Sequence, residues 1–318
     1  MTDRTLVSHD DIRAAREAIA PHVRRTPMMH SPQLSDRLGV ELHLKLELFQ
    51  RTGSFKVRGA LNRMASLTDA ERKRGVVTMS AGNHAQGLAL AARQMGSHAV
   101  IVMPSKAVKS KVDATRNYGG EVVLTDADLV DTMHAIQAER NLVVVSPFDD
   151  PEIIAGAGTV GDEIFDDLPD TDLILTGVGG GGIVSGVGVA ARARRPEARV
   201  VGVEPDGANA MRLSLDKGSP QKLVKAVTVA DGLAAPHAGE LTYAHVKQLG
   251  IEIVTIPDAA IVDAMWTIIE RCKVLAEPAA AAGLAALLCG AVKAEPGSSV
   301  VCILTGGNAD REKLKSMA

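Results

Sequence analysis

Residues 54–60 read Ser-Phe-Lys-Val-Arg-Gly-Ala, so that one lysine stands among small and apolar residues directly after the turn-prone segment 51–53. Apolar side chains recur at helical spacing over residues 57–64, which predicts a helix with Ser54 as its N-cap. Lys56 would then lie in the first turn, where the helix dipole and an apolar setting both favour the neutral amine. A neutral amine is what Schiff-base chemistry with an aldehyde requires. An ordinary solvated lysine on an amphipathic helix is the alternative, and this segment alone does not exclude it.

The composition of the whole chain indicates a globular enzyme with one large or two modest domains. It has 318 residues, a net charge of −3 and only 2% aromatic residues, while alanine and glycine are abundant. This balance favours helices packed closely on a sheet, and it gives no reason to expect a nucleic-acid or membrane partner. Three cysteines in apolar surroundings form neither a metal-ligand pattern nor a disulfide framework. No signal peptide is visible, so we expect a reducing, cytoplasmic location.

Short apolar strands alternate with helices in two successive blocks. The strands expected are residues 41–46, 76–79, 99–103, 121–124, 142–145, 173–176, 200–203, 251–256 and 300–304. The helices expected between them include residues 105–117 and 258–275. Continuous apolar runs separated by helices predict parallel sheets that are covered on both faces. We therefore expect an α/β fold of two doubly wound parallel-sheet domains, a small one at 71–145 and a large one at 1–70 and 146–318. The active site is expected in the cleft between them.

A glycine run follows one of these strands and opens a helix. Residues 177–182 read Gly-Val-Gly-Gly-Gly-Gly, and backbone amides at a helix N-terminus form a cradle for phosphate. A dinucleotide site is the alternative, because Gly177, Gly179 and Gly182 satisfy the spacing G-x-G-x-x-G. Glu204 follows at about the distance of the ribose-binding acid.

Two further motifs stand at strand ends. In residues 80–84 (SAGNH) a fresh helix N-terminus suits a carboxylate, and Asn83 could hold a neutral oxygen or a phenolate; a plain N-cap is the alternative. Thr305 ends the last strand, at the edge of a parallel sheet where ligands bind, and its hydroxyl can donate and accept. An ordinary exit from the strand is the alternative there.

Taken together, the motifs resemble the fold-type II pyridoxal-phosphate enzymes of the serine/threonine dehydratase (threonine ammonia-lyase) and serine racemase family, whose fold is tryptophan synthase β-like. The resemblance rests on residues 45–60 (KLELFQRTGSFKVRGA), 80–87 (SAGNHAQG), 179–182 (GGGG) and 305–308 (TGGN), which occur in the family's order and at similar spacing. It covers essentially the whole chain. It implies that the large domain binds pyridoxal 5'-phosphate. It favours a catalytic Lys56 over a solvated lysine, and it favours a phosphate site of this cofactor over a dinucleotide site at the glycine run.

The resemblance also implies a role for each motif. Lys56 would form the Schiff base with the cofactor and later move the α-proton. The cofactor contacts that it implies are Phe55, Lys56, Asn83, Gly179, Gly180, Gly181, Gly182, Ile183 and Thr305, with the glycines at the phosphate, Asn83 at the phenolic oxygen and Thr305 at the pyridine nitrogen. The substrate contacts that it implies are Ser80, Ala81, Gly82, Asn83 and His84.

Departures from the family pattern narrow the expected activity. Racemases of this family carry a serine acid/base where this chain has Ala81, so a dehydratase is favoured over a racemase. Glu204 matches one position of the family's divalent-cation site, but Ala210 stands at its second acidic position. The sequence therefore matches a site for a divalent or monovalent cation only in part. Biosynthetic members append a regulatory domain after the catalytic chain; because this sequence ends at Ala318, a catabolic or specialised enzyme is expected.

The expected function is therefore a pyridoxal-phosphate-dependent ammonia-lyase that converts a β-hydroxy amino acid, such as L-threonine or L-serine, to a 2-oxo acid and ammonia. A dehydratase for a specialised hydroxy amino acid of the hydroxyectoine-utilisation type, and a serine racemase, are the alternatives within the family. A nicotinamide oxidoreductase and a non-catalytic pyridoxal-phosphate-binding protein are the alternatives outside it. We expect a small amino-acid substrate, a homodimer or homotetramer, and neither nucleic acid nor membrane as partner.

Overall fold

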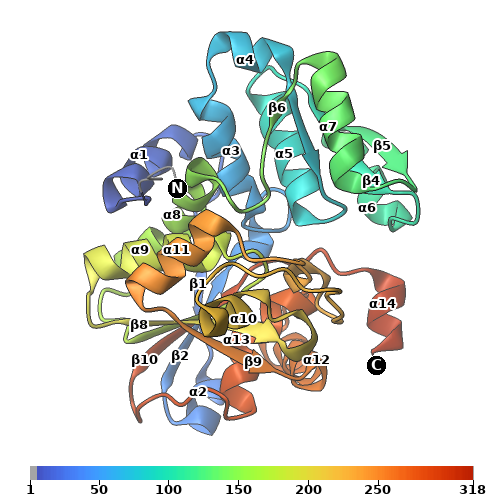
Figure 1. Ribbon diagram of the computed structural model, residues 1–318. Coiled ribbons are helices and arrows are strands. Elements are labelled where there is room, and N and C mark those ends of the chain that lie inside the picture. Colours follow the sequence, from blue (N-terminus) through green and yellow to red (C-terminus); the bar gives the residue numbers. More distant parts are fainter. Residues whose placement is uncertain (1–5, 318) are drawn as a thin grey trace.

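The structure, a computed structural model, describes residues 6–317 and contains two separate sheets (Figure 1). The larger sheet contains, in spatial order, β1 (Met28–His30), β2 (Glu41–Leu46), β10 (Ser299–Leu304), β7 (Leu173–Gly177), β8 (Arg199–Pro205) and β9 (Glu252–Ile256). The smaller sheet contains β5 (Glu121–Thr125), β4 (Ala99–Pro104), β3 (Val76–Met79) and β6 (Val143–Val144) in that order. Every pairing is parallel except that of the edge strand β1 with β2. The predicted α/β class with parallel sheets is confirmed.

Helices cover both faces of the larger sheet, because its strands are apolar on both sides. In β7, Leu173 and Leu175 pack with α12 (Asp258–Thr267) and α13 (Pro278–Leu288), while Ile174 between them packs with α8 (Pro151–Asp167) and α9 (Gly182–Arg194). Successive side chains of a strand point to opposite faces, so a continuous apolar run can fill two cores. The remaining helices around this sheet are α2 (Pro32–Leu38), α10 (Ala210–Lys217), α11 (Glu240–Leu249) and, near the C-terminal end, α14 (Arg311–Ser316).

The smaller sheet has the same construction and forms the upper part of the molecule in Figure 1. Ile101 and Met103 of β4 pack with α3 (Lys56–Ser66) and α5 (Asn83–Gln94), whereas Val100 and Val102 face Met133 of α7 (Leu129–Arg140). The other helices of the upper part are α1 (His9–Ile19), α4 (Asp69–Arg74) and α6 (Lys109–Asn117). No helix in residues 6–317 is both long enough and apolar enough to cross a membrane.

Glycines allow three of the helices to pack almost backbone to backbone. A Cβ added to Gly156 of α8 would lie 2.7 Å from the carbonyl oxygen of Arg58 in α3. A Cβ added to Gly186 of α9 would lie 2.4 Å from the carbonyl oxygen of Ile154 in α8. These distances are too short for any side chain, so α8 holds α3 on one side and α9 on the other. The close helix packing predicted from the glycine and alanine content is found here.

Three local predictions were wrong. The N-cap of α3 is Phe55 and not Ser54, because Ser54 forms an isolated antiparallel bridge with Gly306. The helix predicted from Ser105 begins only at Lys109, after a turn. The helix predicted to continue to Leu275 changes at Thr267 into a π-helical turn over Ile268–Cys272.

Candidate active site

A cavity of about 420 Å³ lies where strands of both sheets end, at the carboxyl ends of β3, β6, β7 and β10. Its wall contains every predicted site residue except Glu204: Phe55, Lys56, Ser80, Ala81, Gly82, Asn83, His84, Gly179, Gly180, Gly181, Gly182, Ile183 and Thr305. The carboxyl edge of parallel strands is where ligands bind in open α/β sheets. Motifs that are far apart in the sequence therefore face one space.

Lys56 is the first residue of α3, and its amine is held in the cavity wall. Its Nζ donates a hydrogen bond to the carbonyl oxygen of Pro147 at 2.8 Å, and the ring of Phe55 lies 5.2 Å away. Burial lowers the pKa of Lys56 to about 8, while the negative charge of Glu277 works in the opposite direction. The amine is thus a nucleophile that is partly neutral near physiological pH.

The glycine loop between β7 and α9 lines the cavity and packs closely against neighbouring side chains. Gly181 has φ +94°, in the left-handed region that favours glycine. A Cβ at Gly180 would lie 2.2 Å from the ring of Phe148, and the hydroxyl of Thr242 donates to the carbonyl oxygen of Gly180 at 2.7 Å. The first amides of α9 have no partner within the helix, so they are available to an anion in the cavity.

The side chain of Asn83 does not cap its own helix, so the N-cap alternative is wrong. Gly82 is the N-cap residue, and Asn83 reaches across to the other part of the molecule. Its Nδ2 donates to Oε1 of Glu277 at 2.7 Å, and its Oδ1 accepts from Nδ2 of Asn308 at 2.8 Å. Glu277 is buried, which raises the pKa of its carboxyl group.

Glu277 was missed in the sequence, where an acidic residue before Pro278 resembles an ordinary start of an apolar helix. The loop after β6, which supplies Pro147 and Phe148 to the cavity wall, was missed as well. The only feature of the sequence that could have pointed to this loop is its position directly after a predicted strand.

His84 lies in the cavity wall with only 2% of its surface exposed. Its ring interacts with the backbone of Val145, although no hydrogen bond of good geometry reaches either ring nitrogen within residues 6–317. Burial, aided by the charge of Lys56, lowers the pKa of His84 to about 3, so the imidazole is neutral.

Thr305, at the end of β10, is buried in the same wall. Its carbonyl oxygen accepts from the backbone N–H of Phe55 at 3.1 Å. This bond places the last motif against the lysine motif.

Glu204 lies outside the cavity wall, and its carboxylate caps α10. It accepts from the backbone N–H groups of Met211 and Arg212, both at 2.8 Å, and burial raises its pKa to about 7. A ribose at the glycine loop would therefore not meet this carboxylate, which speaks against the dinucleotide alternative. Among residues 6–317, no group of three or more His, Cys, Asp or Glu side chains could hold a metal ion. The cation expected at Glu204 stays a prediction.

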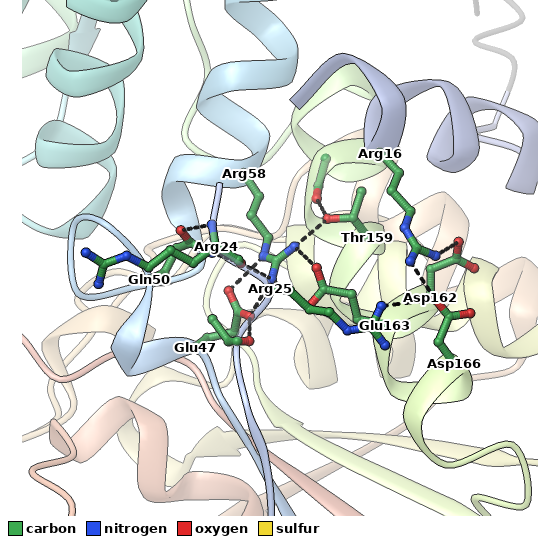
Figure 2. Close-up of polar contacts among 12 residues, drawn as sticks. Arg16, Arg24, Arg25, Glu47, Gln50, Arg58, Thr159, Asp162, Glu163 and Asp166 are labelled. Carbon is green, nitrogen blue, oxygen red and sulfur yellow. Dashed lines mark hydrogen bonds and ion pairs between the residues drawn. The ribbon is translucent and has the colours of Figure 1, made fainter. Parts of the chain in front are cut away.

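A buried ionic network supports the lysine helix from below (Figure 2). Arg58 donates from Nε and Nη2 to Glu47, both at 2.8 Å, and from Nη1 and Nη2 to Glu163 at 2.8 and 2.9 Å. Lys45 donates to Glu163 at 2.7 Å and to the carbonyl oxygen of Thr26 at 2.7 Å. The four charged side chains are almost completely buried, and their two positive and two negative charges balance.

Residues 19–306 match the family of pyridoxal-phosphate dependent enzymes. The chain belongs to this family. It is 43% identical to an L-threonine ammonia-lyase of Thermotoga maritima over 310 residues, which are 96% of this chain and 76% of that protein. It is 40% identical to a catabolic L-threonine dehydratase of Escherichia coli K12, with 98% of this chain and 96% of the relative covered. The structure of maize serine racemase superposes with a TM-score of 0.94 at 38% identity, covering 98% of this chain and 97% of the racemase.

The cavity fits the cofactor of a pyridoxal-phosphate dependent enzyme. An amine with a lowered pKa is available for the aldehyde, and free amides of the glycine loop are available for the phosphate. The amide of Asn83 and the hydroxyl of Thr305 offer groups for the phenolic oxygen and the ring nitrogen. A Cβ would lie 2.2 Å from Phe148 at Gly180 and 2.8 Å from Met211 at Gly181, so only glycine allows the loop to take this position in the cavity wall.

Proposed function

We propose that this protein is an ammonia-lyase that converts a β-hydroxy amino acid, such as L-threonine or L-serine, to a 2-oxo acid and ammonia. The observation that carries the proposal is the position of the Lys56 amine in the same cavity wall as the glycine loop and Ala81. The similarity to an L-threonine ammonia-lyase and an L-threonine dehydratase over nearly the whole chain supports it.

The bound pyridoxal phosphate supplies an electron sink that stabilises negative charge at the substrate Cα. The residues of this chain position the groups that react. In this proposal Lys56 would hold the cofactor through its aldehyde until the amine of the substrate displaces Nζ. The freed Nζ, which its low pKa keeps partly neutral, would then take the α-proton. The β-hydroxyl group takes up a proton and leaves as water, and a water molecule then hydrolyses the released enamine to the 2-oxo acid and ammonia.

The other cavity residues bind and orient. We assign the cofactor phosphate to Gly179, Gly180, Gly181 and Gly182, with the backbone of Ile183, because these residues form the loop before α9 and its first turn. The side chain of Asn83 donates to the phenolic oxygen, Phe55 packs beside the ring, and the hydroxyl of Thr305 faces the ring nitrogen. The segment from Ser80 through Ala81 and Gly82 to His84 binds the substrate carboxylate at the start of α5.

The proposal extends to domain organisation, assembly and location. Residues 71–145 form the small domain, which contains the smaller sheet, and residues 1–70 and 146–318 form the large, cofactor-binding domain. We propose a cytoplasmic homodimer or homotetramer. A cation at Glu204 belongs to the proposal only as a secondary feature, because Ala210 offers no second carboxylate.

The test is a panel of β-hydroxy amino acids incubated with purified holoenzyme, with release of 2-oxo acid as the readout. L-Threonine and L-serine should give 2-oxobutyrate and pyruvate with equal amounts of ammonia. Activity confined to a bulkier hydroxy amino acid would support the alternative of a specialised dehydratase. No 2-oxo acid from any member of the panel would contradict the proposal.

Serine racemisation is the second candidate, favoured by the similarity to maize serine racemase. Racemisation needs a proton donor on the face of Cα opposite Lys56, and the Ala81 methyl group offers none. We expect elimination to be much faster than racemisation, and Ala81→Ser to raise racemisation relative to elimination. Chiral analysis of L-serine incubated with the enzyme measures both. D-Serine formed as fast as pyruvate by the wild type would show that another group serves that face.

A further inference from the structure

The amide of Asn83 is held between two side chains that the sequence motifs do not assign to the cofactor. On one side, Nδ2 of Asn308 donates to Oδ1 of Asn83 at 2.8 Å and to the carbonyl oxygen of Thr52 at 2.7 Å. On the other side, Nδ2 of Asn83 donates to Oε1 of Glu277 at 2.7 Å. These bonds form a continuous chain from Thr52 to Glu277 along the cavity wall.

The donor and acceptor at each link follow from the two ends of this chain. The carbonyl oxygen of Thr52 can only accept, so Asn308 presents its NH₂ group on that side. The same NH₂ group requires an acceptor on Asn83, which is Oδ1. At the other end, an ionised Glu277 can only accept, so it requires the NH₂ group of Asn83. Both constraints favour the same orientation of the Asn83 amide.

Both ends of the chain are held by close packing. A Cβ at Gly53, where φ is +71°, would lie 2.5 Å from Oδ1 of Asn308. A Cβ at Gly306 would lie 2.6 Å from Oε1 of Glu277, whose backbone N–H donates to the carbonyl oxygen of Gly306 at 3.1 Å. A rotated Asn83 amide would place oxygen against the Glu277 carboxylate and NH₂ against the NH₂ of Asn308, leaving buried groups unpaired.

We propose that Asn308 and Glu277 are positioning residues that lock the Asn83 amide, so that its second N–H serves as the hydrogen-bond donor to the phenolic oxygen of pyridoxal phosphate. Among residues 6–317, no hydrogen bond uses this second N–H group. The inference rests on the proposed contact of Asn83 with the cofactor. It adds that the direction of that contact is set by residues from the last motif and from the start of α13.

The first experiment replaces Asn308 by aspartate in the holoenzyme. N308D keeps the shape of the side chain but turns the donor into an acceptor, so the Asn83 amide should rotate and withdraw its N–H from the cofactor. We expect a shifted visible absorption maximum of the bound cofactor and roughly tenfold faster release of pyridoxal phosphate during dialysis. N83A should give the same two changes, and N308A, which adds no charge, should give them in a weaker form.

Asn62 provides the matched control. It is a buried asparagine of α3 whose Nδ2 donates to Oε2 of Glu152 at 2.8 Å, and it does not line the cavity. N62D also breaks a partly buried Asn–Glu bond, so it should lower thermal stability. It should leave the absorption maximum and the rate of cofactor release unchanged.

The double variant N308D/E277Q separates orientation from mere structural support. The amide introduced by E277Q can donate to the oxygen of a rotated Asn83, and the carboxylate introduced by N308D can accept from its NH₂ group, so the hydrogen bonds are restored in reverse. The melting temperature should rise relative to N308D, while the absorption maximum should stay shifted.

Three outcomes would overturn the inference. The first is recovery of the wild-type spectrum together with stability in N308D/E277Q. The second is a wild-type spectrum and release rate in both N308D and N308A. The third is an unaffected N83A, which would also remove the cofactor contact of Asn83. Release of 2-oxo acid by the wild type decides the proposed lyase activity separately.

Discussion

Replacing Arg58 by methionine should destabilise the protein strongly, although the side-chain volume changes little. Arg58 is 1% exposed and, within residues 6–317, is the only side chain whose hydrogen bonds join Glu47 to Glu163 (Figure 2). Without the guanidinium group, Glu47 keeps only the Thr26 hydroxyl as a partner in this network, and Glu163 keeps Lys45. A buried carboxylate without its counter-charge is far less stable than an exposed one.

The size of the effect follows from burial. Removing one partner of a buried ion pair costs about 3–5 kcal/mol, because the other charge is left uncompensated. A chain of 318 residues unfolds with an entropy of about 0.7 kcal/mol/K near its melting temperature, at about 2.1 cal/mol/K per residue. A loss of about 4 kcal/mol therefore lowers the melting temperature by roughly 6 °C.

Arg140 is the matched control, because it also meets a carboxylate with good geometry. Its Nη1 lies 2.8 and 3.0 Å from the two oxygens of Glu121, but the two side chains are 42% and 49% exposed. R140M should cost less than about 1 kcal/mol, or roughly 1.5 °C. Thermal unfolding followed by circular dichroism measures both variants. Equal shifts for R58M and R140M would refute the argument that burial decides the contribution of the network.

Three further predictions concern the cavity. Lys56→Ala should abolish 2-oxo acid formation by more than the roughly 10²–10⁴-fold expected for a lone acid or base, together with the borohydride-sensitive absorption band; a near-normal rate would rule out the role of the amine. Gly180→Ala should purify with little cofactor, because its Cβ would lie 2.2 Å from the Phe148 ring. A second change, Phe148→Ala, should restore cofactor occupancy in part, whereas full occupancy in Gly180→Ala alone would contradict the argument from packing. Because the pKa of Lys56 is lowered from 10.5 to about 8, the neutral fraction of its amine grows as pH rises through 8. Reconstitution of cofactor-free protein should therefore speed up about tenfold from pH 7 to pH 9 and then level off; a rise that continues without a plateau would show an ordinary lysine.

The sequence was most informative where a residue type is restricted by local geometry. Consecutive apolar residues predicted the strands, and the glycine run after β7 forms a loop in the cavity wall. Ser54 was misread because a serine before an apolar helical stretch looks like an N-cap, whereas its backbone pairs with Gly306, more than 250 residues later. Local pattern cannot see a partner at that separation.

The network beneath the lysine helix shows the same limit for charged residues. Lys45 stands in a strand and Glu163 in an apolar helix, and both would be expected to reach solvent. Their burial depends on Arg58, which the fold brings between them. The only signal in the sequence is the presence of charges in segments that are otherwise apolar. Glu277 escaped notice for a related reason, because its contact with Asn83 exists only once the two sheets are placed together.

Gly156 of α8 and Gly186 of α9 set how closely the helices α3, α8 and α9 pack. Lys56 begins α3, and the amides that we propose for the phosphate begin α9. Helix α8 lies between these two helices and approaches each of them closely where a glycine stands. A cofactor that must reach both the amine and the cradle is a rigid object of constant size. One methyl group at Gly156 or Gly186 would move α3 or α9 away from α8, although neither residue lines the cavity. The thickness of the α8 backbone thus sets the distance between the amine of Lys56 and the start of α9.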